Sequence, residues 1–243
     1  KDLGEIYMTI KNFTHLHVHT TYSFLDGANK IKDCIARAKK LGMTSIAITD
    51  HNHIGGWLDF KAECEANDIK PILGCEMYQT YDTNILGLSA DERREKAIEL
   101  AKENGVEIPD KINGKKITKK QIDELIAPYI YDTKQYHLIV LAMNQTGVNN
   151  LIKLQSEAAD KCTYNGRFLC DMEMLKKYNE GLIILSACLG GLVPNNIING
   201  NLEYAEELLL EYKEIFGDRF YVEIQPLFNN EQLIANIELI RLA

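Results

Sequence analysis

The chain has 243 residues, of which 46% are hydrophobic and 26% charged, values that are ordinary for a globular protein. Its formal net charge of −8 and its pI of about 5.3 give no overall positive field with which to hold a nucleic acid. The sequence contains no apolar run as long as a membrane span and no signal peptide, and its six cysteines form no C-x-x-C pair. We therefore expect a cytoplasmic protein without membrane contact, in a reducing setting.

Three histidines occupy alternate positions near the start of the chain. Residues 13–19 are predicted to form a strand, and a strand points alternate residues to one face, so His15, His17 and His19 would share a side. Imidazole is the commonest metal-binding side chain near neutral pH. For a single histidine, a strand that happens to carry a polar residue would be the simpler interpretation. Three in alternation, followed by Asp-His-Asn-His at 50–53, favour a metal site.

Strands and helices are predicted to alternate along most of the chain. The helix at 30–41, for example, carries apolar residues at helical spacing and ends at Gly42. Strands are predicted at 13–19, 45–49, 70–78, 136–142, 182–186 and 220–225, and helices at 30–41, 57–67, 146–159, 171–178, 202–216 and 231–243. This alternation predicts parallel βαβ units. Residues 1–8 are interpreted as an N-terminal extension that ends at a natural start, Met8.

Residues 81–133 interrupt the alternation. They contain a charged helix at 89–104, opened by Ser89 with Glu92 at the spacing of a capping box, and a second helix at 118–127. A polar turn at 111–116 separates the two. We interpret this segment as a solvated polar helical insertion rather than a functional lid.

Two architectures follow from this order, an open doubly wound sheet or a β/α barrel. No G-x-G-x-x-G motif or P-loop opens a helix, which weakens the case for a nucleotide-binding sheet. In a parallel barrel the functional residues gather at the carboxyl ends of the strands. His19, Asp50, His51, Glu76 and Cys188 all lie at or just after a predicted strand end. We therefore favour the barrel.

These side chains are more than one tetrahedral metal ion needs. They suit two or three divalent ions bridged by carboxylates, an arrangement that hydrolyses phosphate esters. Mixed imidazole, carboxylate and thiolate ligands favour zinc or manganese over magnesium. Cys188, as a thiolate, would tilt the choice toward zinc.

Several stretches of the sequence resemble a known family. They are 17–20 (His-Val-His-Thr), 22–28, 41–43, 48–51 (Ile-Thr-Asp-His) and 69–76, and they are similar to the polymerase and histidinol phosphatase (PHP) domain family. The stretches 136–138, 180–188 and 211–221 resemble one branch of it, found at the N-terminus of bacterial DNA polymerase III α subunits. The resemblance runs from about Thr9 to the end of the chain and is weakest over 81–133.

This resemblance implies a distorted seven-stranded β/α barrel with a trinuclear site of nine metal ligands. The matching positions are His17, His19, Asp26, His51, Glu76, His137 and Cys188. Asp50 matches the motif as a residue that orients the ligands, and with His51 it is the expected catalytic pair. The family's last motif, an Asp-x-His after the seventh strand, is missing because the chain stops at Ala243, so we expect a C-terminally truncated domain over 9–243.

Four other histidine and tyrosine residues have separate interpretations. His15 falls outside the family pattern, and we interpret it as a barrel-interior or near-site residue rather than a ligand. His53 is expected on the rim, where it and Tyr22 are candidate substrate contacts. His137 lies at the start of its predicted strand, although the barrel rule places ligands at strand ends, so its assignment rests on the resemblance alone.

The function implied is that of a metal-dependent phosphoesterase with 3′–5′ exonuclease, or proofreading, chemistry. The implied partners are a DNA 3′ end, reached through the full polymerase, the remaining polymerase domains and replisome subunits. The carboxylates that synthesise DNA belong to other domains. One alternative is a catalytically silent module that braces the polymerase. The other is a stand-alone phosphomonoesterase resembling histidinol phosphatase, against which the stretch 211–221 speaks.

Overall fold

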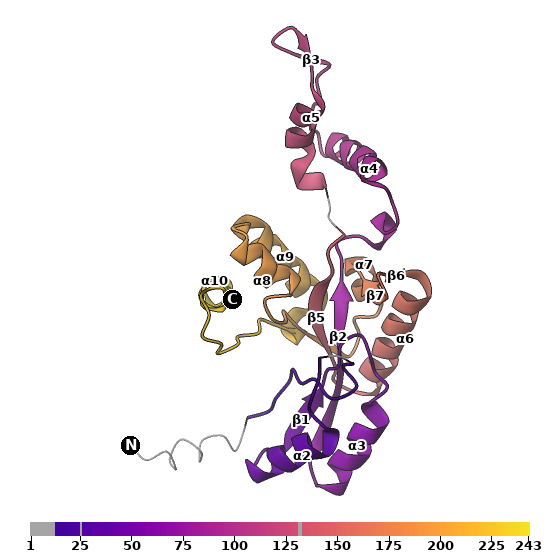
Figure 1. Cartoon of the computed structure of the whole chain (residues 1–243), viewed down its shortest axis with the longest axis vertical. Helices are drawn as coiled ribbons and strands as arrows, with labels where there is room; N and C mark the ends of the chain where they lie inside the picture. Colours follow the sequence, from indigo (N-terminus) through magenta and orange to yellow (C-terminus); the bar gives the residue numbers. More distant parts are fainter. Residues whose placement is uncertain (1–12, 25, 131–132) are drawn as a thin grey trace. The chain divides into compact units, whose positions relative to one another are not determined.

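The computed structural model describes residues 13–24, 26–130 and 133–243 of the chain (Figure 1). The expected extension 1–8, and the first residues of the expected domain, 9–12, lie outside the described residues. The chain divides into two compact units. The main unit runs to Gln79 and resumes at Gln135, and the second unit comprises Thr80–Lys134.

The main unit is built on a mixed sheet in which β2 is central. The strands are β1 (Ser45–Ile48), β2 (Lys70–Gln79), β5 (Tyr136–Ala142), β6 (Thr163–Tyr164), β7 (Arg167–Cys170), β8 (Leu182–Leu185) and β9 (Phe220–Tyr221). Their order is β6-β7-β2-β5-β8-β9, with β1 paired in parallel to the first half of β2. Within the described residues this is an open ladder. The α/β class is as predicted, whereas the seven-strand barrel count stays a prediction.

The prediction that all strands run parallel is wrong for β5. This strand is antiparallel to both β2 and β8. The chain leaves β2 at Gln79 and re-enters β5 at Tyr136, and these two residues are register partners. The second unit is therefore an elaborated hairpin connection, and a hairpin needs no crossover helix. Sequence alternation alone could not distinguish this connection from a βαβ crossover.

The segment 13–19 is extended but forms no regular strand, contrary to the prediction. It lies along β1, where Ala47 N donates to His15 O at 2.8 Å and Thr49 N donates to Val18 O at 2.9 Å. Between these two hydrogen bonds, the segment 13–19 advances by three residues (His15 to Val18) while β1 and the residue after it advance by two (Ala47 to Thr49). A β-bulge introduces an offset of this kind. The Thr49 hydroxyl accepts from Val18 N at 2.8 Å and completes the pairing. Because of this offset, the three alternating histidines do not share one environment.

The helices of the main unit agree closely with the predicted ones. They are α2 (Ile31–Lys40), α3 (Trp57–Ala66), α6 (Gln145–Lys161), α7 (Met172–Lys177), α8 (Leu192–Ile198), α9 (Leu202–Phe216) and α10 (Asn230–Leu242). Only α8, the β6–β7 hairpin and a 3-10 turn, η4 (Gly217–Arg219), were not predicted, and β9 is shorter than predicted. Asn144 and Asp171 cap α6 and α7 through side-chain oxygens. No helix in the described ranges is both long and apolar enough to cross a membrane.

A buried apolar layer supports the end of the sheet that carries the polar residues. Ala47, Ile139, Leu141, Leu185 and Ala187 form it, each at most 6% exposed. They come from β1, β5, β8 and the turn that follows β8. All six cysteines of the chain are free thiols.

The second unit has its own small core. It contains η2 (Thr83–Ile85), α4 (Ala90–Glu103), a hairpin of β3 (Lys111–Ile112) and β4 (Lys115–Lys116), α5 (Lys119–Ile126) and η3 (Ala127–Tyr129). The side chains of Ala97, Ala101 and Ile126 are buried against one another. The predicted capping box is present, with Ser89 accepting from Glu92 N and Glu92 accepting from Ser89 N.

Candidate metal centre

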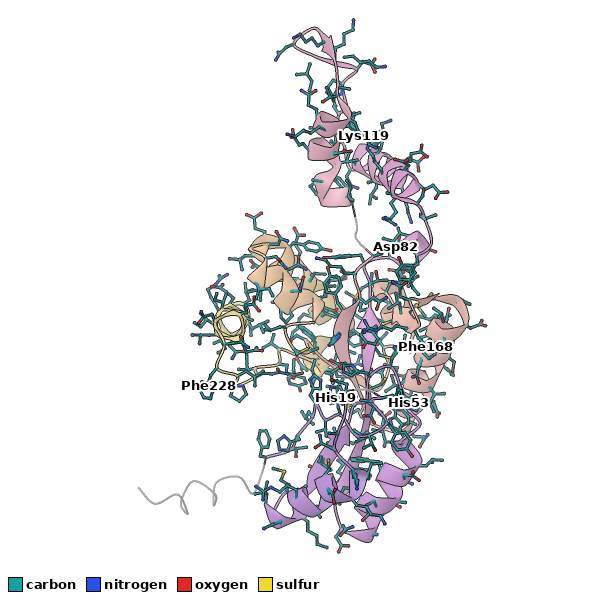
Figure 2. The ribbon with its side chains drawn as sticks, in the orientation of Figure 1. His19, His53, Asp82, Lys119, Phe168 and Phe228 are labelled. Atoms are coloured by element: carbon teal, nitrogen blue, oxygen red, sulfur yellow. The ribbon has the colours of Figure 1, made fainter. Side chains whose placement is uncertain are left out.

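Four imidazoles surround one buried carboxylate at the end of the sheet. Glu76, in β2, is 1% exposed. Its Oε1 lies 2.9 Å from His137 Nδ1 and 3.4 Å from His17 Nε2. Its Oε2 lies 2.6 Å from His51 Nδ1 and 3.3 Å from His19 Nε2. Figure 2 labels His19 in this cluster.

The sheet register explains how these residues meet. His51 follows β1 and forms an isolated parallel bridge with Glu76. His137 lies opposite Tyr78, near the carboxyl end of β2. Because β5 is antiparallel to β2, its first residues reach the same edge of the sheet as the last residues of β2 and β8. The position of His137 at a strand start is therefore consistent with a site at this edge.

The polar surroundings of the Glu76 carboxylate are imidazoles. Both oxygens are buried, and four imidazole nitrogens lie within 3.4 Å of them. A buried carboxylate is costly unless it is paired with positive groups or coordinates a metal. Three groups each bring their ligand atoms within 4.8 Å of one another, namely His17/His19/Glu76, His19/Asp26/His51 and His51/Glu76/His137. Nitrogen and oxygen donors so placed fit divalent transition metals.

Outer partners orient the ring nitrogens of this cluster. Glu223 Oε1 lies 2.8 Å from His17 Nδ1, which leaves Nε2 directed toward Glu76. Ser23 Oγ lies 3.1 Å from His19 Nδ1. A carboxylate or hydroxyl behind a metal-binding imidazole fixes its tautomer and orientation. Sequence reasoning missed both partners. Glu223 lies inside the predicted strand 220–225, and only the structure, in which β9 ends at Tyr221, shows that it follows a strand end.

Asp26 lies at the open side of the cluster. Its Oδ2 is 2.7 Å from His51 Nε2, and its side chain is 63% exposed. The two nitrogens of His51 thus face two carboxylates, Asp26 and Glu76. This arrangement would let His51 contribute to the site from either nitrogen.

Burial and charge shift the pKa values of the cluster in opposite directions. Burial favours the neutral form of Glu76, but His137, His17 and His51 outweigh it and hold the Glu76 pKa well below its usual range. Burial also opposes a charge on His17, yet Glu223 and Glu76 raise its pKa to about 10. For His137, burial is again outweighed, by Cys188 and Glu76, and the pKa rises to about 9.

His19 and His51 shift in opposite directions. Burial lowers the pKa of His19, and the attraction of Glu76 does not offset burial together with the neighbouring His51 and His17. Burial also opposes a charge on His51, but Glu76 and Asp26 raise its pKa. Neutral imidazole is the form that binds a metal, so His19 is the histidine most readily available as a ligand.

Asp50 holds the loop that carries the histidines. It is 1% exposed, and its carboxylate accepts from Thr20 N at 2.6 Å, Thr20 Oγ1 at 2.8 Å and Ser23 Oγ at 2.6 Å. Ser23 in turn reaches His19 and accepts from the N–H of His51 at 3.1 Å. We interpret Asp50 as a positioning residue rather than a group that touches substrate.

Cys188 lies at the edge of the cluster, in the loop after β8. Its Sγ is 3.4 Å from His137 Nδ1 and accepts from Gly190 N at 3.4 Å. The preceding residue, Ala187, has a positive φ of 61°, an uncommon conformation for a residue with a side chain. This turn directs the thiol toward His137.

The two candidate substrate contacts lie apart from the imidazole cluster. Tyr22 Oη donates to Asp59 Oδ2 at 2.6 Å, and its ring stacks loosely on His53 with centroids 6.1 Å apart. His53 is exposed, and its Nδ1 accepts from Gly55 N at 3.1 Å (Figure 2). These contacts hold Tyr22 and His53 on the outer surface. Their role toward substrate stays a prediction.

The interpretation of His15 as a barrel-interior residue is wrong. Its side chain is exposed and packs edge-on against Phe13, with ring centroids 4.9 Å apart. The offset pairing of 13–19 with β1 separates it from His17 and His19. It does lie near the site, because all three histidines line a cavity of about 700 Å³.

A stack of planar groups leads outward from the cluster. The His19 and His51 rings are 4.1 Å apart and nearly parallel, and His51 lies 5.9 Å from Tyr78 at an interplanar angle of 9°. The Arg167 guanidinium covers the Tyr78 ring at 4.3 Å, and its Nη1 donates to Gln135 Oε1 at 2.8 Å. Among the described residues, no carboxylate forms an ion pair with Arg167. Neither Tyr78 nor Arg167 belongs to a motif that could be recognised in the sequence.

Comparison with known proteins places this geometry in a family context. The family model described as "PHP domain" matches residues 15–226. The chain is 38% identical to the DNA polymerase III subunit alpha of Borreliella burgdorferi over 94% of its length, and 34% identical to that of Aquifex aeolicus over 96%. Those alignments cover 16% and 17% of the two relatives. The chain thus spans about a sixth of the length of these curated relatives.

Similarity to solved structures is weaker. An amidohydrolase from Chromobacterium violaceum has 16% sequence identity and a TM-score of 0.40, over 87% of this chain and 76% of that one. We infer neither fold nor function from a similarity at this level. The family match covers most of the chain and all seven of the predicted ligand positions. On that basis, the chain belongs to the PHP domain family.

Proposed function

We propose that this chain is the PHP domain of a bacterial replicative DNA polymerase III α subunit, and that it is a metal-dependent phosphodiesterase acting on DNA 3′ ends. The observation that carries the proposal is the buried Glu76 carboxylate, whose two oxygens lie within 3.4 Å of four imidazole nitrogens. The similarity of the chain's sequence to DNA polymerase III α subunits supports DNA as the substrate.

In this proposal the cluster residues hold up to three divalent ions, zinc or manganese. Glu76 is the shared ligand, and the histidines supply nitrogen donors on both sides of it. Asp26 and Cys188 would add an oxygen and a sulfur donor at the edges. When bound, such ions supply hydroxide near neutral pH and neutralise phosphate oxygens.

Residues around the cluster would position the substrate and the ligands. Glu223 fixes the orientation of His17, and Asp50 fixes the loop that carries His19. Arg167 is a cation without a carboxylate partner in the described part of the chain, at the outer end of the ring stack. We propose that its guanidinium binds a phosphate next to the scissile one, which a phosphomonoester substrate lacks.

The test combines metal content with hydrolysis. The purified chain is dialysed, its zinc and manganese are measured by elemental analysis, and a 5′-labelled single-stranded oligonucleotide is followed for shortening from its 3′ end. We expect bound metal and a 3′–5′ ladder, both lost in His137→Ala and retained in Lys153→Gln, a change at an exposed residue of α6. Metal binding with turnover of histidinol phosphate but none of the oligonucleotide would instead make the chain a phosphomonoesterase.

Arg167 gives a second test of the substrate. Arg167→Gln is expected to slow cleavage of the oligonucleotide about 10- to 100-fold, while hydrolysis of a small phosphomonoester changes little. Arg167→Lys keeps the charge but loses the planar fork, so we expect an intermediate rate. Equal slowing with both substrates would contradict phosphate recognition by Arg167.

A structural role is the second candidate. The cluster joins the segment 13–19, β2, β5 and the loop after β1, so a bound ion would cross-link four parts of the main unit. If the variant His17→Ala/His19→Ala lowers the melting temperature in zinc but cleavage of the oligonucleotide is undetectable before and after the change, the structural role is favoured.

A further inference from the structure

The second unit carries a dense positive charge at its hairpin. Residues 111–120 contain five lysines and no acidic residue, and all five lysines are exposed: Lys111, Lys115, Lys116, Lys119 and Lys120. The whole chain has a net charge of −8, so this is a local reversal of sign. We call residues 111–120 the basic hairpin.

Lysines face one another across the two strands. Lys111 is the direct register partner of Lys116. Like charges directly opposite each other destabilise an antiparallel pair. Ile112 is the only residue of 111–116 that is even half-buried, so the hairpin has little core packing with which to offset this repulsion. Figure 1 shows the hairpin extending beyond α4 and α5 of the same unit.

The start of α5 also departs from favourable helix electrostatics. The N-terminus of a helix favours acidic side chains and disfavours basic ones. In α4 the capping box uses Glu92, with Asp91 beside it. In α5 the capping box uses the neutral Gln121, and the first two helical residues are Lys119 and Lys120 (Lys119 is labelled in Figure 2). Both helices therefore begin with a capping box, but the first turn of α4 is acidic and the first turn of α5 is basic.

The positive charge is only partly neutralised. Lys119 Nζ lies 3.3 Å from Asp91 Oδ1, and Lys120 Nζ lies 3.9 Å from Glu124 Oε1. Within the described ranges, no ion pair involves the other three lysines of the hairpin. The cross-strand lysine pair and the two lysines at the start of α5 both destabilise the fold. Local rules broken without a gain in stability are typical of binding sites.

The composition of the basic hairpin indicates what it binds. Residues 110–120 contain no arginine and no aromatic residue, and Asn113 and Gly114 form a polar tip. Protein interfaces are enriched in aromatic residues and arginine and depleted in lysine. Lysine clusters also attract anionic membranes, but stable membrane binding usually adds apolar residues that insert, and the two isoleucines of the hairpin, Ile112 and Ile117, are half-buried. Lysines on flexible stems suit phosphate contacts that do not depend on sequence.

We propose that the basic hairpin binds the phosphate backbone of a nucleic acid strand without sequence preference. The inference goes beyond the proposed hydrolysis, because it concerns another unit of the chain and needs no metal. The basic hairpin would let a protein with a net negative charge bind a polyanion locally.

The test measures binding by fluorescence anisotropy in the presence of EDTA. The full chain is titrated into a fluorescein-labelled single-stranded oligonucleotide of mixed sequence, at salt concentrations between about 50 and 200 mM. We expect binding that weakens with salt. In Lys111→Gln/Lys115→Gln/Lys116→Gln the dissociation constant should rise about tenfold or more, and the slope of log K against log salt should become shallower by about 2.

Two variants serve as controls. Lys70→Gln/Lys102→Gln/Lys153→Gln changes the net charge equally at exposed lysines outside the basic hairpin, and we expect a change of less than about twofold. Arginine at positions 111, 115 and 116 keeps the charge and should keep the binding. EDTA removes divalent metal from the measurement, so this binding does not depend on the proposed hydrolysis, and the two proposals can fail separately.

One single substitution should move stability and binding in opposite directions. Lys116→Glu replaces a repulsive cross-strand pair with an attractive one, so amide hydrogen exchange in the hairpin should slow while the oligonucleotide binds more weakly. The proposal is overturned if the lysine-to-glutamine triple variant binds like the wild type, if the control triple variant weakens equally, or if the chain binds anionic phosphatidylserine vesicles and not the oligonucleotide.

Discussion

Glu76 is the residue on which the candidate metal centre depends. It lies between four histidines that come from the segment 13–19, the end of β1 and the start of β5. Its carboxylate stays ionised despite burial because the imidazoles outweigh the cost of desolvation. Without a metal or these imidazoles, a charge at this depth would be strongly unfavourable.

Removing the charge of Glu76 should therefore weaken metal binding more than a substitution of a residue that only hydrogen-bonds to a ligand. Glu223→Gln, which weakens the partner of His17, should lower zinc affinity about 10- to 100-fold. Glu76→Gln should lower it further, because the ligand itself is lost. Competition with a chromophoric chelator measures both. Equal effects of the two substitutions would contradict the assignment of Glu76 as the shared ligand.

Ligand-type residues at strand ends were visible in the sequence, whereas their partners were not. Glu76 and His51 could be predicted because each lies at the end of a predicted strand. Glu223 and Ser23 could not be ranked above other polar residues, because only the three-dimensional arrangement brings them behind His17 and His19. For His15, the near-site alternative agrees with the structure, whereas the barrel-interior alternative fails because the pairing of 13–19 with β1 has an offset.

At the scale of elements, strand and helix positions follow the sequence pattern but strand direction does not. The predicted range 136–142 agrees with β5, whose short continuous apolar run indicates a buried strand. Its direction depends on where the chain returns after residues 80–134, and local pattern carries no information about that. The antiparallel direction is what places His137 beside Glu76.

Gly74 reports on how closely β2 and β5 pack. A Cβ at this position would lie 2.5 Å from Leu141 Cδ2 and 2.8 Å from Val140 O. We expect Gly74→Ala to destabilise the chain by about 1–3 kcal/mol, measured by urea unfolding. Adding Leu141→Val removes one of the two clashes and should recover part of the loss. No recovery would show that the contact with the Val140 carbonyl dominates.

Glu157 joins α6 to the end of α7 and to the residue that follows it. It accepts from Lys177 Nζ at 2.6 Å, Tyr178 Oη at 2.5 Å and Lys161 Nζ at 2.9 Å, and these contacts lower its pKa from 4.5 to about 2. Because the pKa is lower in the folded state, the stabilisation is complete above pH 4.5 and is lost as the pH falls toward 2.

Glu157→Gln should therefore lower the urea midpoint at pH 7, and the difference from the wild type should shrink as the pH falls through this window. Glu173→Gln is the matched control, since its carboxylate is 81% exposed and pairs only with Lys176 and solvent among the contacts described. If the difference in urea midpoint between Glu157→Gln and the wild type stays the same at pH 2, the stabilisation by Glu157 comes from packing and not from its charge.

At the scale of the whole molecule, metal should act on one unit. Trp57 is the only tryptophan in the sequence, is buried in the main unit and donates its indole N–H to Gly74 O at 2.9 Å. Its fluorescence therefore reports unfolding of the unit that holds the cluster. At a zinc concentration about 100 times the dissociation constant, we expect this transition to be stabilised by about 2.7 kcal/mol.

Amide hydrogen exchange in α4 supplies the comparison. This helix belongs to the second unit, which has its own core of Ala97, Ala101 and Ile126. Its protection should change little when zinc is added. If protection of α4 rises as much as the Trp57 transition, the two units unfold together and the division into separate cooperative units is wrong.

Because the pKa values of His17 and His137 are raised, a metal ion that binds them must displace protons from both imidazoles. With pKa values of about 10 and 9, both imidazoles carry a proton near pH 7.5, and metal binding must release it. The heat of zinc binding should then depend on the ionisation enthalpy of the buffer, with a slope equal to the protons released. Titration calorimetry in PIPES and in HEPES, which differ in ionisation enthalpy and bind zinc weakly, gives that slope, and a slope near zero would contradict the protonation of these two histidines. Acidification would therefore weaken metal binding, because protons compete with the metal for these ring nitrogens.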